Sequence, residues 1–486
     1  MGDLSTNIMK KIIPILIIVL LLVAGAYWYF FLHTSSTGTT GDGSTNSSGG
    51  FSPFGRPTTN TGNQTPTTNT NSNSPTGTNG SPTQGKIPTL RLLSNDPVGG
   101  YGASTTVLRI VEPIVTIPDV ISTSTASTTP KKPVSKVAVA TSTIKLLPIT
   151  IVRWVDRGRG NVLEARSNTL DITTLSNTVI PKIFESAWNK NVTSFIGTLF
   201  QETGSKTSVV YADLKARILP KVATTTASAS STIPIITNTA SLTPFELKGK
   251  NLPENLIAYA TSPNKDKIFM LVNEGGTGVG YTSTFDGKLV TQIFTTPLTQ
   301  VNVEWPEEKT IAITTKGTAS EGGYLYFVDP KTGFWRKILG PIVGISTKTS
   351  MDAKHVLVST TGSAKNVLMS VYTVSEKKGI DAVVRTIADK CVWGNFYKDM
   401  VYCAAPSQPV EATYPDDWYK GAVSFVDKIW QINSGTGEIK LVSSLVDASD
   451  RVIDAINLGL DNKDDFLIFM NKNDLSLWSL DLVSSN

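Results

Sequence analysis

The sequence predicts an all-β fold, a seven-bladed β-propeller, and this prediction depends on three observations. The first is a repeat, in which polar turns that follow extended apolar runs recur every 44 residues; these turns are marked by Thr261, Trp305, Thr349 and Trp393. A period of about 40 to 45 residues filled with short strands is typical of propeller blades. The second is the presence of four strand patterns in one repeat, and the third is an incomplete repeat at each end of the domain.

The repeat that begins at residue 300 shows its four strands most clearly. These strands are expected at 300–305, 310–315, 323–328 and 334–339. A polar turn separates the first two strands, and Asp329-Pro330-Lys331-Thr332-Gly333 separates the last two. In such a turn proline presets φ and glycine accepts a positive φ. We therefore expect each strand to run antiparallel to the one before it.

The number of blades follows from tracing this unit outward. Similar turns occur at Trp188 and Leu460, which lie 73 residues before and 67 residues after the regular series. Inserted loops account for the excess over 44 residues in both cases. A degenerate repeat in 97–103 and 149–176 comes before them. We therefore predict seven blades, with six or eight as the alternatives.

The two ends of the domain complement each other. The last strand pattern, 475–482, is the third of its repeat and no fourth strand follows it. Near the start, 90–94 is a single strand whose Leu93-Ser94-Asn95 repeats Leu175-Ser176-Asn177, the end of a fourth strand. We expect the early strand to complete the last blade, which would close the ring and remove an exposed sheet edge.

Residues 1–33 are predicted to hold a cytoplasmic N-terminus and a transmembrane anchor. Lys10 and Lys11 precede 21 uncharged residues, 12–32. About 20 apolar residues span a hydrocarbon core of ~30 Å, and flanking lysines favour the cytoplasmic side. The propeller is then extracytoplasmic, in a single-pass protein of the cell membrane. The alternative is a cleaved signal peptide, for which Val23-Ala24-Gly25-Ala26 offers small residues.

Residues 34–86 are expected to form a disordered linker, because they are almost entirely Thr, Ser, Gly, Asn and Pro. The propeller then occupies 87–486, with low-complexity inserts near 112–147 and 217–244. Successive loops of an antiparallel meander alternate between the two faces, so the linker and both inserts are expected on one face. Our hypothesis is that this face is turned to the membrane. The alternative is that exposed loops simply tolerate insertions.

Composition limits the function classes. Charged residues make up 17% of the chain and the net charge is +5, with lysines and arginines scattered, which argues against nucleic-acid binding. The two histidines, His33 and His355, are too few and too far apart to suggest a metal site. Cys391 and Cys403 flank one turn, so we expect a disulfide in an oxidising compartment, with two buried thiols as the alternative.

One insert is the candidate partner-binding loop. It spans 404–421, and its candidate residues are Tyr414, Asp416, Asp417, Trp418 and Tyr419. Exposed aromatic rings beside carboxylates suit a loop that binds a sugar or a peptide. The two aspartates could also be an acid/base or cation-binding pair. The alternatives are that the aspartates form turns and caps, and that Trp418 covers the blade.

The repeat length, the Asp- and Asn-rich turns and the tryptophan near the end of each first strand resemble the TolB-like and WD-repeat propeller superfamily, over 87–486. With its anchor and linker, the chain also resembles membrane-anchored propellers of bacterial envelopes. The turns at 329–335 and 433–437 resemble a structural motif of quinoprotein propellers. The residues that would hold a quinone are not identifiable, so no cofactor is expected. The resemblance implies a fold and leaves the function open.

We therefore expect an extracytoplasmic binding or scaffolding module of the cell envelope, with a protein or a cell-wall glycan as its partner. The alternative is an envelope hydrolase or a quinone-dependent dehydrogenase. No catalytic residue is assigned. An enzyme should show inward-facing carboxylates, arginines or an ion at the central channel, whereas a scaffold should show an apolar or aromatic patch on one face.

Overall fold

The computed structural model describes residues 87–114, 141–200, 207–217, 244–362 and 365–483. The expected membrane anchor at 12–32, the expected linker at 34–86 and most of both inserts lie outside these residues. Within the described ranges, no helix has the length and apolar character needed to cross a membrane.

The described residues form seven four-stranded sheets, here called blades 1 to 7. Blade 1 holds β2 (Val98–Ile114), β3 (Thr141–Asp156), β4 (Val162–Arg166) and β5 (Ile172–Thr174). Blade 2 holds β6 (Ile183–Trp188), β7 (Ser194–Phe200), β8 (Thr207–Ala216) and β9 (Phe245–Leu252). Blade 3 holds β10 (Leu256–Thr261), β11 (Lys267–Glu274), β12 (Thr277–Thr284) and β13 (Thr291–Thr296). Blade 4 holds β14 (Val301–Glu307), β15 (Thr310–Thr315), β16 (Gly322–Val328) and β17 (Trp335–Val343).

The remaining blades follow the same pattern. Blade 5 holds β18 (Ser346–Thr349), β19 (His355–Thr361), β20 (Val367–Thr373) and β21 (Lys378–Asp381). Blade 6 holds β22 (Cys391–Trp393), β23 (Met400–Pro406), β24 (Asp427–Asn433) and β25 (Ile439–Ser444). Blade 7 holds β26 (Ala455–Leu460), β27 (Phe466–Asn471), β28 (Leu477–Asp481) and β1 (Leu90–Ser94). Three short helices, η1 (Ala388–Lys390), α2 (Asp416–Tyr419) and α3 (Leu445–Ser449), lie between strands.

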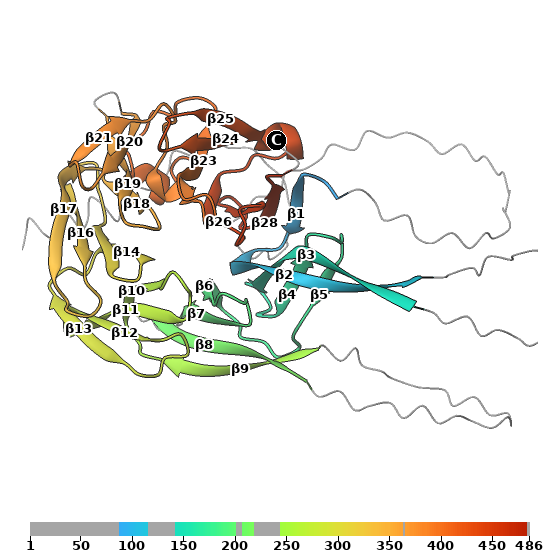
Figure 1. The fold of residues 1–486 in the computed structure, drawn as a ribbon. Coiled ribbons are helices and arrows are strands. Elements are labelled where there is room, and N and C mark those ends of the chain that lie inside the picture. The colour runs from blue at the N-terminus through green and yellow to red at the C-terminus, as the bar shows by residue number, and fades with distance from the viewer. Residues whose placement is uncertain (1–86, 115–140, 201–206, 218–243, 363–364, 484–486) are drawn as a thin grey trace, which may run out of the picture. The chain divides into compact units, whose positions relative to one another are not determined.

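The seven blades surround a centre, and the first strand of each blade lies nearest to it (Figure 1). The second strands are the most buried, because the blades on either side cover both faces of the sheet. In β11, β15, β19 and β27, at least four consecutive residues are buried. Their apolar, β-branched and aromatic residues suit a strand that is covered on both sides. The predicted seven-bladed propeller is confirmed.

The first described strand closes the ring. β1 pairs antiparallel with β28, with Leu90 opposite Leu480, so blade 7 takes its fourth strand from the start of the domain. Hydrogen bonds then join blade 7 to blade 1, because the Tyr101 hydroxyl donates to the carbonyl of Ile468 at 2.8 Å. The Arg91 side chain donates to the carbonyls of Arg166, Thr169 and Leu170 in and beside blade 1. This closure is the one that the sequence predicted.

The hairpin of blade 1 is longer than expected. β2 and β3 remain paired from Val98 and Asp156 out to Ile114 and Thr141. Residues 112–114 and 141–147 therefore belong to strands, and the expected insert at 112–147 is shortened at both ends. At the second end the reason is that Thr141, Thr143 and Ile144 are β-branched and favour an extended strand, although the composition of this segment looks of low complexity.

The predicted turn chemistry between third and fourth strands is present. The Asp329 carboxylate accepts the backbone N–H groups of Lys331 and Thr332 at 2.8 and 2.9 Å, and Gly333 has a φ of 70°. In blade 6, Asn433 accepts the backbone N–H groups of Gly435 and Thr436 in the same way. In both turns the side chain stabilises the local backbone.

Candidate functional site

The candidate loop crosses several blades. It is the connection between the second and third strands of blade 6, residues 407–426, which we call the strap. Hydrogen bonds join the strap to three other blades. The Ala412 N–H donates to the Lys365 carbonyl of blade 5, and Asp416 accepts the N–H of Ala319 in blade 4. The Trp418 carbonyl accepts a hydrogen bond from Lys472 of blade 7. The strap is therefore held over the central part of the face that carries the connections between second and third strands.

Two of the aromatic residues expected to be exposed are buried. Trp418 and Tyr414 are 5% and 3% exposed, whereas Tyr419 is 46% exposed. Tyr414 and Trp418 pack with Phe425 and Ile387 in one hydrophobic cluster. Thus Trp418 covers the blade, which is the alternative that the sequence left open, and the expectation of a fully exposed aromatic loop is wrong for these two residues. Their burial depends on residues from other segments, which the local sequence does not reveal.

Both aspartates of the strap accept hydrogen bonds from backbone N–H groups. Asp417 accepts the N–H of Thr413 at 2.7 Å, and Asp416 accepts the N–H of Ala319 at 2.7 Å. The Asp417 contact is local and agrees with the interpretation as a turn or cap, whereas the Asp416 contact joins the strap to blade 4. Neither places the two carboxylates together as an acid/base pair.

A buried ion cluster lies beneath Trp418. The Lys390 side chain is 0% exposed, and its ammonium donates to Asp427 at 2.8 Å, to Asp454 and to the Ala455 carbonyl at 2.8 Å. Trp418 Nε1 donates to Asp454 at 3.0 Å. Burial raises the pKa of Asp427 to about 6, against the opposing effect of the Lys390 charge. The cluster joins blade 6 to blade 7 and anchors the strap, because buried charges are stable only when they are paired.

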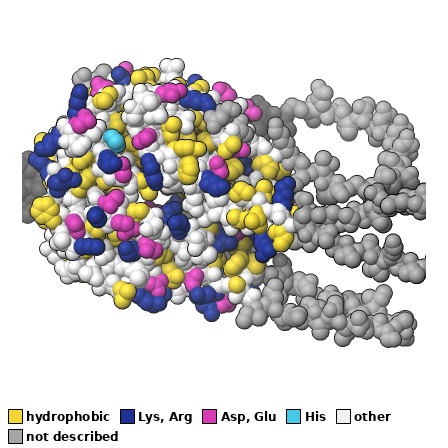
Figure 2. All heavy atoms as spheres, viewed as in Figure 1, with side chains coloured by type: hydrophobic (Ala, Val, Ile, Leu, Met, Phe, Trp, Pro, Cys, Tyr) yellow, Lys and Arg dark blue, Asp and Glu magenta, His cyan; other side chains and the backbone are white. Residues whose placement is uncertain are grey.

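A cavity of about 610 Å³ lies between the first strands of the blades, with Trp418 and Tyr419 at its edge. Its titratable lining includes Glu185, Tyr259, Glu304, Lys348, Asp389 and Tyr419. These residues come from blades 2, 3, 4 and 5, from η1 and from the strap. Elsewhere on the face that Figure 2 shows, acidic and basic side chains are scattered among hydrophobic ones without a large patch of one sign. The cavity is therefore the place where charged groups from many blades converge.

Two of its carboxylates are paired. Glu304 and Lys348 form an ion pair at 2.9 Å, and the Glu304 charge raises the pKa of Lys348. Asp389 accepts hydrogen bonds from the Tyr419 hydroxyl and, at 3.0 Å, from Ser346. Burial raises the pKa of Asp389, and burial together with the Asp389 charge raises the pKa of Tyr419.

The third carboxylate of the cavity, that of Glu185, is not paired in this way. The Glu185 side chain reaches the solvent in the cavity, yet within the described residues it has no ion-pair or hydrogen-bond partner. The surrounding protein desolvates it and raises its pKa. Tyr259 lies close enough for the Glu185 charge to add to the burial that raises the pKa of this tyrosine. Glu185 is therefore an uncompensated negative charge that faces an open volume.

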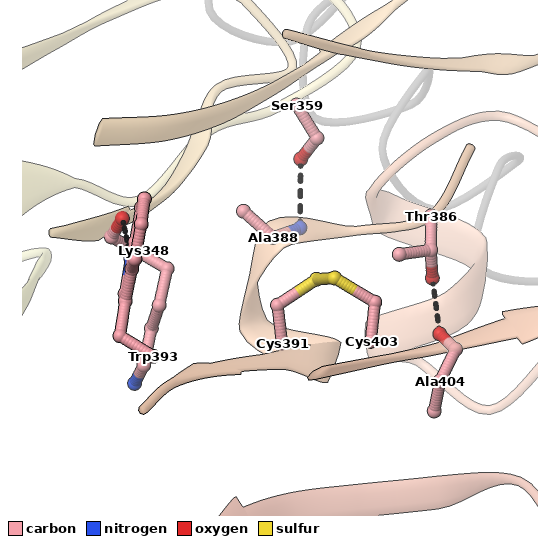
Figure 3. The surroundings of a disulfide bond; sticks show 8 residues. All are labelled: Lys348, Ser359, Thr386, Ala388, Cys391, Trp393, Cys403 and Ala404. Carbon is pink, nitrogen blue, oxygen red and sulfur yellow. Dashed lines mark hydrogen bonds between the residues drawn. A yellow bond between two sulfur atoms is a disulfide. The ribbon is translucent and has the colours of Figure 1, made fainter. Parts of the chain in front are cut away.

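The disulfide supports the segment that carries Asp389 and Lys390. Cys391 and Cys403 face each other on β22 and β23 and are bonded (Figure 3). Next to them, Ala388 N–H donates to Ser359 at 3.1 Å and the Thr386 hydroxyl donates to the Ala404 carbonyl at 2.8 Å. η1, which directly precedes Cys391, is thus fixed on both sides, with Lys390 in the ion cluster and Asp389 at the cavity.

The charged residues of the cavity were not predicted from the sequence. Glu304 and Lys348 each directly precede a turn marker, Trp305 or Thr349, so both occupy the same position of adjacent repeats. Charged residues at such inward positions were an available signal. Glu185 lies three residues before Trp188 in a strand with no local motif, and its place in the cavity is visible only when the blades are assembled. Among the described residues, no group of three or more His, Cys, Asp or Glu side chains is arranged to hold a metal ion.

Comparison with known proteins finds distant structural neighbours. No protein-family model and no curated protein matches the chain. TolB from Acinetobacter baumannii is similar in structure at 11% identity and a TM-score of 0.34, over 66% of this chain and 59% of that chain. The β-propeller domain of the Trilobed protease from Pyrococcus furiosus is similar at 10% identity and a TM-score of 0.42, over 68% and 92%. An oligogalacturonate lyase in complex with manganese is similar at 10% identity and a TM-score of 0.41, over 69% and 86%.

TolB and other propeller proteins are thus among the structural neighbours, as the resemblance to the TolB-like superfamily implies. The chain spans less than two thirds of the length of the TolB structure given above. At these identities the similarity concerns the fold alone.

Proposed function

We propose that this chain is a membrane-anchored, extracytoplasmic binding module of the cell envelope, and that its ligand enters the cavity beside Tyr419. The partner is an envelope protein or a cell-wall glycan. The observation that carries the proposal is the convergence of side chains from five blades and the strap on one cavity of about 610 Å³, with Glu185 left unpaired among the described residues. Pockets for small molecules and polymer ends are typically about 300 to 1,000 Å³ and hold a few convergent polar groups.

The extracytoplasmic location rests on the sequence and on the cysteines. The uncharged segment 12–32 with Lys10 and Lys11 before it would place the propeller outside the cytoplasm. Disulfides persist in oxidising compartments, and Cys391 and Cys403 form one in this structure. An impermeant maleimide should therefore label a Leu289→Cys variant in intact cells, because Leu289 is 82% exposed on the propeller. Labelling only after lysis would refute this location.

Binding through the cavity is tested by blocking it. The full-length chain in detergent is mixed with an insoluble envelope fraction and sedimented, and the bound share is measured. Asn302→Trp fills the cavity, since Asn302 lines it and is exposed there. Leu289→Trp adds the same ring at an exposed turn of blade 3 and is the control. We expect sedimentation to fall several-fold for Asn302→Trp only. Equal sedimentation of wild type and both variants would refute binding through the cavity.

A second candidate function is catalysis in the same cavity. Glu185 and Asp389 both have a raised pKa, and carboxyl groups tuned in this way are suited to general acid or base roles. Inward-facing carboxylates were also the feature expected of an enzyme. If the chain is an envelope hydrolase, the same envelope fraction should release soluble fragments over time, and Asp389→Asn should stop this release. Retention of the polymer without release supports the binding function.

A further inference from the structure

We propose that the cavity recognises a protonated primary amine at Glu185, and that the ligand which carries this amine is an amino sugar. This inference rests on the proposed function and names the class of ligand that the same cavity takes. It is drawn from the pairing of the charged groups, from the polar side chains that face the cavity, and from the volume available.

The charge pairing leaves one position for a cation. Glu304 has Lys348 as its partner at 2.9 Å, and Asp389 accepts hydrogen bonds from Tyr419 and Ser346. Glu185 has no such partner among the described residues, and its side chain is exposed within the cavity. A desolvated carboxylate is stabilised either by a proton or by a cation at hydrogen-bond distance. An ammonium group of the ligand would supply this cation.

The protein's own cations are unsuited to this position. Lys348 is bound to Glu304, and Lys472 donates to the Trp418 carbonyl and lies over the Trp418 ring at 4.5 Å. Lys316, on the connection after β15 in blade 4, lines the same cavity but forms no ion pair with Glu185. The Tyr259 side chain beside Glu185 adds a phenol ring, and aromatic rings attract ammonium groups. Carboxylate and ring together form one wall that suits an amine.

The remaining polar side chains suit a polyhydroxylated ring. Asn302 and Asn457 line the cavity from blades 4 and 7, and both are exposed within it. An amide offers a donor and an acceptor on adjacent atoms, which fits neighbouring hydroxyl groups. A purely aliphatic amine would offer these amides no hydroxyl group to bond. An amino sugar occupies the carboxylate and the amides together.

Affinity is expected to depend on pH through Glu185. The titratable and charged groups that line the same cavity are Tyr259 on β10, Glu304 on β14, Lys348 on β18, Asp389 on η1, Tyr419 on α2, Lys316 and Lys472. As pH falls through the raised pKa of Glu185, its carboxylate gains a proton and loses its attraction for the ammonium. Binding should therefore weaken on acidification, at a pH above the usual range of a glutamate.

The test is calorimetric titration of the full-length chain with the β-1,4-linked disaccharide of glucosamine. The N,N′-diacetylated disaccharide is the matched uncharged probe. We expect the amine to bind about tenfold or more tightly than its acetylated form, since hydrogen bonds to charged groups are the stronger ones. Glu185→Gln keeps the shape and should remove this preference and its pH dependence. Glu246→Gln, an exposed ion-paired residue on β9 of the same blade, should change neither.

Four outcomes decide the question. Loss of the amine preference in Glu185→Gln, with an unchanged thermal unfolding midpoint, supports the inference. Equal binding of the two disaccharides overturns it, as does binding of N-acetyl-lysine methylamide in place of the amino sugar. If neither sugar binds while the envelope fraction is still retained by wild type and lost by Asn302→Trp, the amino-sugar inference fails and the proposed function stands.

Discussion

The Tyr419 hydroxyl donates a hydrogen bond to the Asp389 carboxylate, and this contact ties the strap to the edge of the central cavity. Tyr419 belongs to blade 6, and Asp389 lies in the helix η1 that leads into the same blade. The strap also contacts blades 4, 5 and 7. The strap therefore contributes Trp418 and Tyr419 to a cavity that the blades otherwise line.

Loss of the Tyr419 hydroxyl should loosen the strap without unfolding the ring. Tyr419→Phe removes one charge-assisted hydrogen bond, which we expect to lower the free energy of unfolding by about 1 to 2 kcal/mol. Amides of the strap should then exchange with deuterium faster than in wild type. Tyr397→Phe is the control, because no side-chain hydrogen bond involves that exposed hydroxyl among the described residues. Unchanged exchange in the strap would contradict this role.

Removal of the buried ammonium should be strongly destabilising. Lys390→Met leaves Asp427 and Asp454 as buried carboxylates without their cation, and loss of one partner of a buried ion pair costs about 3 to 5 kcal/mol. Chemical denaturation at pH 7 measures the effect. The control is Lys420→Met, whose exposed side chain lies 3.9 Å from Asp416 and should change stability by less than about 1 kcal/mol. Similar results for the two variants would remove the cluster as an anchor of the strap.

The raised pKa of Asp427 should make its contribution to the free energy of unfolding larger at pH 5 than at pH 7. Its pKa in the fold is about 6, above its usual value of 3.8, so the folded state binds its proton more tightly than the unfolded state. The contribution to stability therefore increases as pH falls from above 6 towards 3.8. The Asp427→Asn variant lacks this titrating carboxyl group. As pH is lowered from 7 to 5, the free energy of unfolding of wild type should therefore rise relative to that of the variant. Parallel pH profiles of the two proteins would contradict the assignment.

The disulfide should stabilise the fold measurably. Cys391 and Cys403 are 12 residues apart, and a crosslink across a loop of this size is worth about 2 to 3 kcal/mol. The double variant Cys391→Ala, Cys403→Ala should be destabilised by this amount in denaturant unfolding. A reductant should lower the stability of wild type similarly and leave the double variant unchanged. A reductant effect on both proteins would point to some other cause.

Ring closure by β1 should depend on the buried residues of that strand and much less on the exposed one. Leu90 is buried in the core between blades 6 and 7, whereas Leu92, on the same face of the strand two residues further on, is 38% exposed. Leu90→Asp places an unpaired charge in that core and should lower the unfolding free energy by about 3 kcal/mol or more. Leu92→Asp should have a much smaller effect. Equal effects at the two positions would contradict the observed pairing of β1.

The architecture could be predicted because it depends on the spacing of strands and turns along the sequence. The 44-residue interval between Thr261 and Trp305 recurs because each blade repeats the same four strands. The strand at Leu90 could be assigned to the last blade because a third strand at 475–482 lacked its partner. Both inferences need only the order of residues along the chain.

The site could not be predicted in the same way, because distant blades assemble it. Glu185 and Glu304 are separated by 119 residues, from 304 − 185, yet line one cavity. Trp418 was expected to be exposed because its neighbours are polar. Its burial depends on Lys390 and Asp454, which meet beneath it only in the folded ring. A local pattern of aromatic and acidic residues does not distinguish a binding loop from an anchored strap.

Protection of a single thiol in the cavity tests the binding function most directly. Asn302→Cys places the only free thiol in the described part of the chain, since Cys391 and Cys403 are bonded to each other. Its rate of reaction with a small maleimide is measured with and without soluble envelope fragments, beside Leu289→Cys. We predict that the fragments slow the reaction at residue 302 several-fold and leave residue 289 unchanged. Equal rates at residue 302 with and without the fragments would show that the ligand does not enter the cavity.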